Sequence, residues 1–189
     1  MSLKAKRVHV LVFILLVLIL FCETRYGLVR GAIVNDVSME PNLTAGQYVV
    51  YERFSIFGDD IYRGDIVAIK NDKIYSSDDF GKIQKTFLVK RVIGLPGETI
   101  YEKNCRIYVK RPGFIPVRIK ESYYRYRSCE PFVANLGSDQ YFVMGDNRPH
   151  SEDSRDFGPI SKEFIVGKLV FEFNPNVLST TYWYFLTRK

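Results

Sequence analysis

The sequence predicts a mainly β domain that follows an N-terminal transmembrane helix. Two patterns lead to this fold class. An apolar run over residues 8–22 follows a basic tip, and the rest of the chain consists of short apolar or alternating stretches between turn residues. Aromatic residues make up 15% of the 189 residues, which also favours strands. We therefore divide the chain into a cytoplasmic tip and anchor, residues 1–26, and an exported β-rich domain, residues 27–189.

The anchor is predicted from charge and from the length of the apolar run. Lys4, Lys6 and Arg7 precede this run, which is short for a spanning helix of about 20 residues. A cleaved secretory signal has a similar pattern, but no Ala-x-Ala-like site follows Phe21, so we favour a retained single-pass anchor. The positive-inside rule then predicts a cytoplasmic amino terminus. Everything after about Tyr26 would lie on the outer side of the plasma membrane, in the periplasm or outside the cell.

The strands of the domain are predicted from runs of alternating or continuous apolar residues. These runs are Tyr48–Phe54, Ile66–Ile69, Thr86–Ile93, Arg106–Val109, Val117–Ile119, Tyr141–Met144 and Gly167–Phe173. Turn residues such as Gly94-Leu95-Pro96-Gly97 separate them, which is typical of a mainly antiparallel β domain. The less regular segments 76–82 and 105–135 are predicted as loops or an inserted hairpin.

Charge and residue usage limit the partners and cofactors. The net charge of +6 is compatible with nucleic acid or an anionic membrane surface. One stretch, Tyr123–Arg127, alternates aromatic and basic residues as a nucleic-acid platform does, and we interpret it as a solvated loop or strand edge. The only histidines are His9 and His150, so no Cys/His cluster has metal-ligand spacing. We expect no nucleic acid, no metal and no cofactor, and a monomer that contacts membrane lipid.

Two further features stay open at this level. Cys105 and Cys129 would lie in an oxidising compartment, where a bridge closing a loop of roughly 25 residues contributes about 3–4 kcal/mol, but the sequence does not decide whether it forms. The apolar tip Phe54–Gly58 fits equally well in the core or, in a tethered domain, in the membrane interface.

A serine on a stiff bend is the first candidate for chemistry. Ser38 lies in Asp36-Val37-Ser38-Met39-Glu40-Pro41-Asn42-Leu43, where Pro41 restricts the backbone around it. A nucleophilic serine needs a base to take its proton, and a neutral lysine can do so. In an alternating strand Lys90 shares a face with Leu88 and Val92. A lysine on such a face either extends to solvent or is buried, and burial would lower the pKa of its amine.

Four motifs occur in a fixed order after the anchor. They are Ser38-Met39-Glu40-Pro41, Gly64-Asp65-Ile66-Val67, Lys90-Arg91-Val92-Ile93-Gly94-Leu95-Pro96-Gly97, and Gly145-Asp146-Asn147-Arg148 with Ser151-Glu152-Asp153-Ser154-Arg155. This set resembles the bacterial type I signal peptidases (leader peptidases), from the anchor to about Phe173. The resemblance implies a domain of coiled β-sheets and a membrane-bound serine endopeptidase that removes signal peptides.

The resemblance also assigns roles to residues. Ser38 corresponds to the nucleophile, Lys90 to the general base and Ser151 to the hydroxyl that orients the lysine amine. Asp153 and Arg155 correspond to a buried structural pair. Two further residues, Asp146 and Arg148, would brace the same loop.

The expected substrate is an exported preprotein bound as an added strand beside residues 33–37 and 87–89. Met39, Leu43 and Val89 flank the Ser/Lys dyad and would wall a shallow apolar pocket. Because a shallow pocket rejects large side chains, we expect cleavage after Ala-x-Ala-like residues.

One departure from the family pattern concerns the oxyanion hole. Family members usually carry Ser or Gly two residues before the nucleophile, where this chain has Asp36. A carboxylate opposes the developing negative charge, so we expect the hole to form from the backbone N–H groups of Ser38 and Asp36. A milder departure is Asn42, which replaces the usual Thr after the proline.

Two alternatives remain at the level of sequence. An inactive binding or scaffolding module of the same fold is favoured by Asp36, but the joint presence of Ser38, Lys90 and Ser151 argues against it. A Ser/His enzyme would use His150 with a nearby aspartate, Asp146 or Asp153. Because His150 lies inside the proposed structural loop, we favour the Ser/Lys dyad.

Overall fold

Strands dominate the computed structural model, which describes residues 13–14, 29–52, 60–77, 83–123 and 129–173. They form two antiparallel sheets, one of seven strands and one of four. The mainly β class predicted from the sequence is therefore confirmed. Each predicted run lies in a strand or overlaps one.

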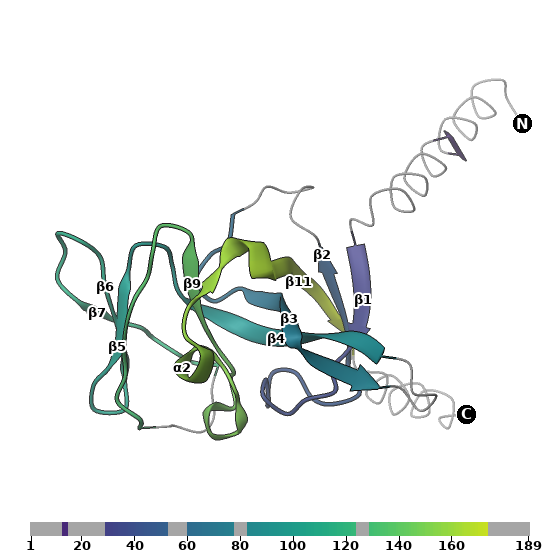
Figure 1. Ribbon diagram of the computed structural model, residues 1–189, viewed down its shortest axis with the longest axis horizontal. Coiled ribbons are helices and arrows are strands. Elements are labelled where there is room, and N and C mark those ends of the chain that lie inside the picture. Colours follow the sequence, from purple (N-terminus) through teal and green to yellow (C-terminus); the bar gives the residue numbers. More distant parts are fainter. Residues whose placement is uncertain (1–12, 15–28, 53–59, 78–82, 124–128, 174–189) are drawn as a thin grey trace, which may run out of the picture.

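The large sheet has the strand order β1-β2-β11-β3-β4-β9-β10. Its strands are β1 (Val29–Ile33), β2 (Tyr48–Glu52), β3 (Ile66–Ser77), β4 (Ile83–Gly94), β9 (Gln140–Met144), β10 (Ile160–Ser161) and β11 (Ile165–Phe173). The small sheet has the order β7-β6-β5-β8, with β5 (Thr99–Glu102), β6 (Ile107–Lys110), β7 (Val117–Arg118) and β8 (Val133–Asn135). Figure 1 shows the small sheet at the opposite end of the domain from β1 and β2.

The structure adds strands that the sequence did not predict. The β3–β4 hairpin is longer than expected because Ser76 and Ser77 pair with Gln84 and Ile83, so the predicted loop over 76–82 begins within a strand. The strands β1, β5 and β10 were not predicted. The strand β8 lies in the segment 105–135 that was predicted as loops or a hairpin, and it forms because β5 offers it a paired edge.

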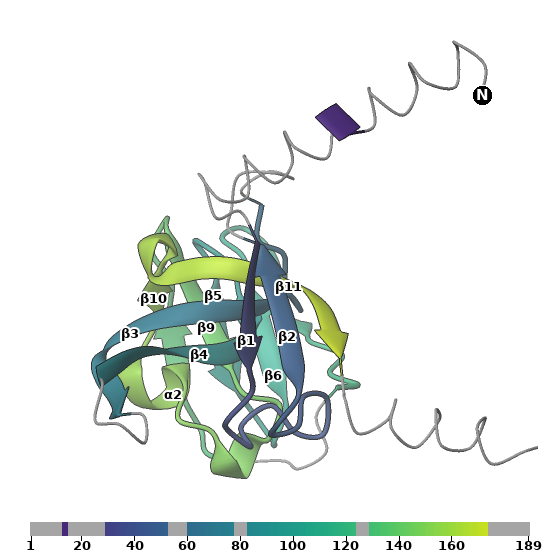
Figure 2. The same ribbon diagram turned by 90° about the vertical axis from the view of Figure 1, so that its right-hand side faces the viewer.

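Bulges bend the large sheet. The register shifts between Lys70 and Tyr75 in β3, and twice in β11, once on each side of Lys168. Such irregularities increase the local twist of a sheet. In Figure 2, β1 and β2 consequently run across β3 and β4 instead of lying flat beside them.

Three apolar clusters form the core. One lies between β3, β4, β9 and β11 around Val67, Val92 and Val143, and a second joins β4 and β9 to the small sheet around Ile93 and Phe142. The third packs the segment after β1 against the large sheet, and its members are Val34, Met39, Leu43 and Val49. This third cluster fixes the segment that carries Ser38.

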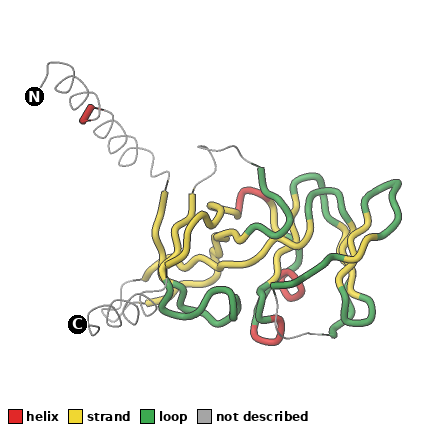
Figure 3. Tube along the Cα trace, turned by 180° about the vertical axis from the view of Figure 1, so that it is seen from behind, coloured by secondary structure: helices red, strands yellow, loops and turns green. Residues whose placement is uncertain are grey.

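Short helices connect β9, β10 and β11 of the large sheet. They are the 3-10 helices η1 (Arg148–His150) and η2 (Lys162–Phe164) and the helix α2 (Ser154–Phe157). Asp153 begins α2 with a capping box, in which its carboxylate accepts from the backbone and Asp156 accepts from the N–H of Asp153. Viewed from behind, these helices lie between the two strand-rich ends of the domain (Figure 3).

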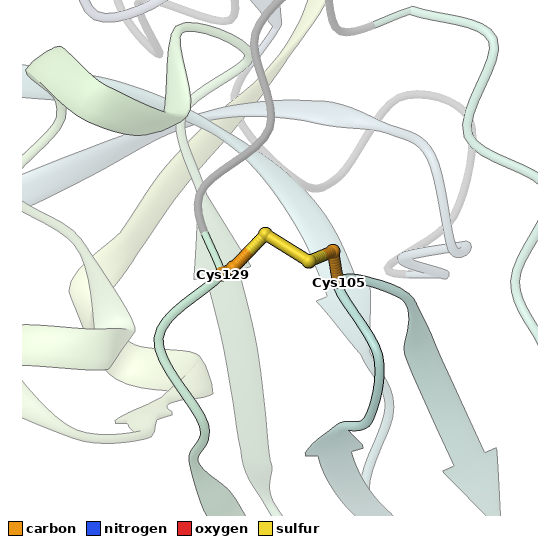
Figure 4. The surroundings of a disulfide bond; sticks show 2 residues. All are labelled: Cys105 and Cys129. Carbon is orange, nitrogen blue, oxygen red and sulfur yellow. A yellow bond between two sulfur atoms is a disulfide. The ribbon is translucent and has the colours of Figure 1, made fainter.

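A disulfide between Cys105 and Cys129 closes a segment that contains β6 and β7 (Figure 4). The structure thus decides the question that the sequence left open. Glu102 lies beside both sulfur atoms, but two sulfurs joined to each other do not supply the thiolates that a metal site needs.

Several predictions fall outside the described residues. The apolar tip Phe54–Gly58 does, as does the Tyr123–Arg127 cluster apart from Tyr123. The predicted anchor, residues 1–26, is described only at residues 13 and 14. In the portions of chain that are described, no helix has the length and apolar character to cross a membrane.

Candidate active site

Ser38 is held in a turn directly after β1. The amide of Val34 donates to the carbonyl of Gln47 at 2.9 Å, and the amide of Leu43 donates to the carbonyl of Met39 at 3.0 Å. Met39 and Leu43 are almost fully buried in the third apolar cluster. The two buried side chains of Met39 and Leu43 therefore fix the bend that carries the hydroxyl of Ser38.

Lys90 reaches this hydroxyl from the middle of β4. Its Nζ lies 2.7 Å from Oγ of Ser38, and the side chain is fully buried. Neighbouring strands cover both edges of β4, with β3 on one side and β9 on the other. As the alternating pattern predicted, Leu88 and Val92 belong to one apolar cluster, whereas Val89 packs in another.

The environment of Lys90 favours the neutral amine. Burial removes water from the charged form and lowers the pKa of Lys90. The carboxylates of Asp36, Asp153 and Glu152 oppose this effect, and the guanidinium of Arg155 adds to it. The net result is a pKa below the usual lysine value, as a lysine base requires.

Asp36 contacts both members of the pair. Its Oδ1 accepts a hydrogen bond from the backbone N–H of Ser38 at 3.1 Å, and its Oδ2 lies 4.0 Å from Nζ of Lys90. The side chain is 59% exposed. The N–H of Ser38, which the sequence assigned to the oxyanion hole, is therefore bonded to the carboxylate of Asp36 in this structure.

Ser151 packs against the glycine that begins the last motif. An added Cβ at Gly145 would meet Oγ of Ser151 and would lie 2.5 Å from the carbonyl oxygen of Ser38. The Oγ of Ser151 is buried and has no hydrogen-bond partner within the described part of the chain. The orienting role of Ser151 toward Lys90 stays a prediction.

Asn147 clamps the serine turn, a role that sequence reasoning missed. Its backbone N–H donates to the carbonyl of Ser38 at 2.9 Å, and its side-chain amide donates to the carbonyl of Val37 at 3.1 Å. The motif Gly145-Asp146-Asn147-Arg148 contained this residue, but nothing in the local sequence indicated its partner.

Asp146 joins the serine turn to the strand of Lys90. Its carboxylate accepts two bonds from Arg91, at 2.8 and 2.6 Å, and one from the amide of Asn42 at 2.8 Å. The guanidinium of Arg91 also lies 4.3 Å from the ring centre of Tyr123. Arg91 and Asn42 thus meet at Asp146, a contact that the sequence did not assign.

Two further ion pairs hold the loop that follows β9. Arg155 bonds both oxygens of Asp153 at 2.9 Å, and Arg148 pairs with Glu121. Although burial alone would raise the pKa of Asp153, the Arg155 guanidinium and the N–H of Gly145 hold it below its usual range. All four residues predicted to brace this loop, Asp146, Arg148, Asp153 and Arg155, are buried or nearly so.

A groove of about 620 Å³ contains the Ser38–Lys90 pair. Residues 31–36 form one wall and residues 87–90 the other, so the curled sheet brings the end of β1 opposite β4. Of the predicted pocket residues, Met39 and Val89 line this groove, whereas Leu43 lies fully buried in the cluster beneath it. His150 is exposed at the end of η1 and does not line the groove, which disfavours a Ser/His arrangement.

Comparison with known proteins gives consistent matches along the chain. A family model described as signal peptidase, peptidase S26, matches residues 7–174. Signal peptidase I P of Bacillus subtilis subsp. natto is 36% identical over 84% of this chain and 85% of its own. Signal peptidase I V of Bacillus subtilis strain 168 is 34% identical over 71% of this chain and 79% of its own.

A crystal structure of a signal peptidase I from Enterococcus faecalis V583 is 26% identical, with a TM-score of 0.45, covering 59% of this chain and 97% of that one. The family match spans the four motifs, and together with these relatives it confirms the resemblance drawn from them. The chain therefore belongs to the signal peptidase family, peptidase S26, and is a serine peptidase.

Proposed function

We propose that this peptidase cleaves exported preproteins with a Ser38/Lys90 dyad, after Ala-x-Ala-like residues, while anchored in the membrane by residues 1–26. The observation that carries the proposal is the 2.7 Å distance between Nζ of Lys90 and Oγ of Ser38 inside an open groove. A buried amine with a lowered pKa can accept a proton from a hydroxyl at this distance.

The reaction proceeds in two stages. Neutral Lys90 takes the proton of Ser38 as Oγ attacks the carbonyl carbon of the scissile bond. The resulting ammonium gives that proton to the leaving amine, and an acyl ester on Ser38 remains. Lys90 then takes a proton from a water molecule, the hydroxide attacks the ester, and the proton returns to Oγ as the new carboxyl terminus leaves. In this scheme Ser151 orients the amine of Lys90, and the backbone N–H groups of Ser38 and Asp36 bind the developing oxyanion.

The shape of the groove supports an extended substrate. Among the described strands β1 pairs only with β2, so the backbone groups on its other edge can bind an added strand. Met39 and Val89 line the groove that holds the dyad, and Leu43 packs with them in the third apolar cluster. These apolar walls support the preference for small apolar residues at the cleavage site.

The test uses the full chain in detergent with a preprotein that ends its signal peptide in Ala-x-Ala. We expect cleavage after the second alanine, loss of cleavage in Ser38→Ala and Lys90→Ala, and retention in His150→Ala. Ser151→Ala should lower kcat more than it raises KM. Cleavage that persists in Lys90→Ala, or that disappears in His150→Ala, would exclude the dyad.

A further inference from the structure

The carboxylate of Asp36 lies where a substrate carbonyl oxygen would have to bind. Its Oδ1 accepts the backbone N–H of Ser38 at 3.1 Å. In the proposed reaction this N–H points at the oxyanion, because it belongs to the nucleophile itself. The other oxygen, Oδ2, lies 4.0 Å from Nζ of Lys90. One carboxylate thus contacts the hydrogen-bond donor and the base of the same site.

The exposure of Asp36 allows this carboxylate to leave. Its side chain is 59% exposed and lines the groove, whereas that of Lys90 is 1% exposed. The carboxylate can therefore rotate into solvent without disturbing the core. A hydrogen bond to a charged acceptor is stronger than one to a neutral carbonyl, so the carboxylate competes well with a bound substrate.

We propose that the Asp36 side chain is a latch, which holds the Ser38 N–H and the Lys90 amine in the resting enzyme and which the substrate must displace. This inference rests on the proposed function of the dyad. Asp36 is then a positioning residue that acts on two catalytic groups, the N–H of Ser38 and the amine of Lys90. The latch lowers the turnover rate and moves the acidic limb of the activity to higher pH.

The pH dependence follows from the charges that face Lys90. Asp36 comes from the turn after β1, while Glu152, Asp153 and Arg155 come from the loop and helix after β9. Asp153 is already engaged by Arg155 and by the N–H of Gly145. Each nearby carboxylate favours the protonated amine. Removal of the Asp36 carboxylate should therefore extend activity to lower pH.

Three variants separate charge from hydrogen bonding. Asp36→Ala removes both effects. Asp36→Asn removes the charge but keeps an oxygen that can accept the Ser38 N–H. Glu152→Gln removes a different carboxylate that faces Lys90, in a residue with no bond to Ser38 N–H.

Two readouts are measured with the full chain in detergent. The first is kcat and KM for preprotein cleavage across the pH range. The second is the ratio of the affinities of a substrate-like peptide aldehyde and of the matching peptide alcohol. Oγ of Ser38 adds to the aldehyde carbon, its proton passes to Lys90, and the former carbonyl oxygen becomes an anion in the oxyanion hole. The alcohol has no carbonyl for Oγ to attack and binds the groove without forming this adduct, so the ratio reports on formation of the adduct and of the oxyanion that the hole binds.

We expect Asp36→Ala to raise kcat by about 10-fold or more, since one oxyanion donor is typically worth about 10²–10³-fold in rate. The acidic limb of its profile should move to lower pH, and its aldehyde-to-alcohol ratio should rise. Asp36→Asn and Glu152→Gln should also move the acidic limb of the pH profile to lower pH. The aldehyde-to-alcohol ratio should rise less in Asp36→Asn than in Asp36→Ala, and it should not rise in Glu152→Gln.

The latch is overturned if Asp36→Ala lowers kcat at every pH and Asp36→Asn restores it, because Asp36 would then merely support the turn. It is also overturned if the limb and the ratio stay unchanged while wild-type cleavage depends on Ser38 and Lys90. In that case the proposed function stands alone. If neither wild type nor Asp36→Ala cleaves the preprotein or binds the aldehyde, both proposals fail.

Discussion

Arg91 and Asp146 form a two-bonded ion pair beside the dyad, with N···O distances of 2.8 and 2.6 Å. Arg91 follows Lys90 in β4, and Asp146 holds Asn42 of the serine turn at 2.8 Å. The pair thus connects the strand of the base to the turn of the nucleophile. It fixes the distance between two groups that come from separate parts of the fold.

Asp146→Asn should disrupt this connection. The change leaves the mostly buried guanidinium of Arg91 without its carboxylate, and loss of one partner of a buried pair costs about 3–5 kcal/mol. We expect a comparable fall in the free energy of unfolding in urea and a lower kcat. Lys168→Gln is the matched control, because it removes a partly exposed pair with Asp65 and should cost less than about 1 kcal/mol. Equal losses in both variants would contradict the connecting role.

The activity should rise with pH along a limb set by Lys90. Burial lowers the pKa of this amine below its usual value, so the neutral base is present at a lower pH than for a free lysine. A profile of kcat/KM against pH measures the limb. We expect it to be unchanged in His150→Ala, since His150 is exposed and outside the groove. A limb that disappears in this variant would point to a histidine base.

Lys90→Met should inactivate the enzyme and stabilise the fold. General-base catalysis contributes about 10²–10⁴-fold, so kcat should fall by at least the lower figure. The pKa of Lys90 is lower in the folded chain than in the unfolded chain. In the pH window between these two values only the unfolded chain holds the proton, so the free energy of unfolding of the wild type rises with pH there. Below the window wild-type folding carries a penalty of about 1.4 kcal/mol for each unit of lowering.

The neutral methionine removes this penalty, so the advantage of Lys90→Met should be largest below the window and vanish above it. Urea unfolding at several pH values measures the difference. A variant that is less stable than the wild type at neutral pH would show that the buried amine stabilises the fold.

Gly145→Ala should damage both stability and activity. The new Cβ would lie 2.5 Å from the carbonyl oxygen of Ser38 and against Oγ of Ser151, and both must move. Overpacking of this kind typically costs about 1–3 kcal/mol. Gly31→Ala is the control for stability, because nothing lies within 4 Å of its added Cβ. Thermal unfolding of both variants, with kcat for Gly145→Ala, tests whether the glycine is needed for close packing.

Loss of the Cys105–Cys129 disulfide should destabilise the domain by about 3–4 kcal/mol, because the bridge closes a segment with a sequence separation of 24. The variant Cys105→Ser/Cys129→Ser and the wild type treated with a reductant should both unfold at a lower temperature. Reductant should leave the double variant unchanged. If it lowers the stability of the variant equally, the effect does not come from this bridge.

The sequence by itself determined the mainly β class, the positions of most strands and the candidates Ser38 and Lys90. These features depend on short-range patterns, since alternation, turn residues and a proline bend act within a few residues. The apolar neighbours of Lys90 two residues away on each side placed its side chain on an apolar face but left open whether it reaches solvent or is buried, and the structure shows it buried. The motifs supplied its partner through family resemblance.

Only the tertiary structure decided which groups meet around the dyad. Val37 and Asn147, joined by a hydrogen bond, are 110 positions apart, and Asn42 and Asp146 are 104 apart. Their contact depends on bulges that curl the sheet and bring the turn after β1 against β4 and β9. The hydrogen bond from the Ser38 N–H to the carboxylate of Asp36 joins residues that are close in sequence. The approach of this carboxylate to Lys90 also depends on the curled sheet. The physical reason is that local patterns set strand and turn, whereas the distance between two strands' side chains is set by the packing of the whole sheet.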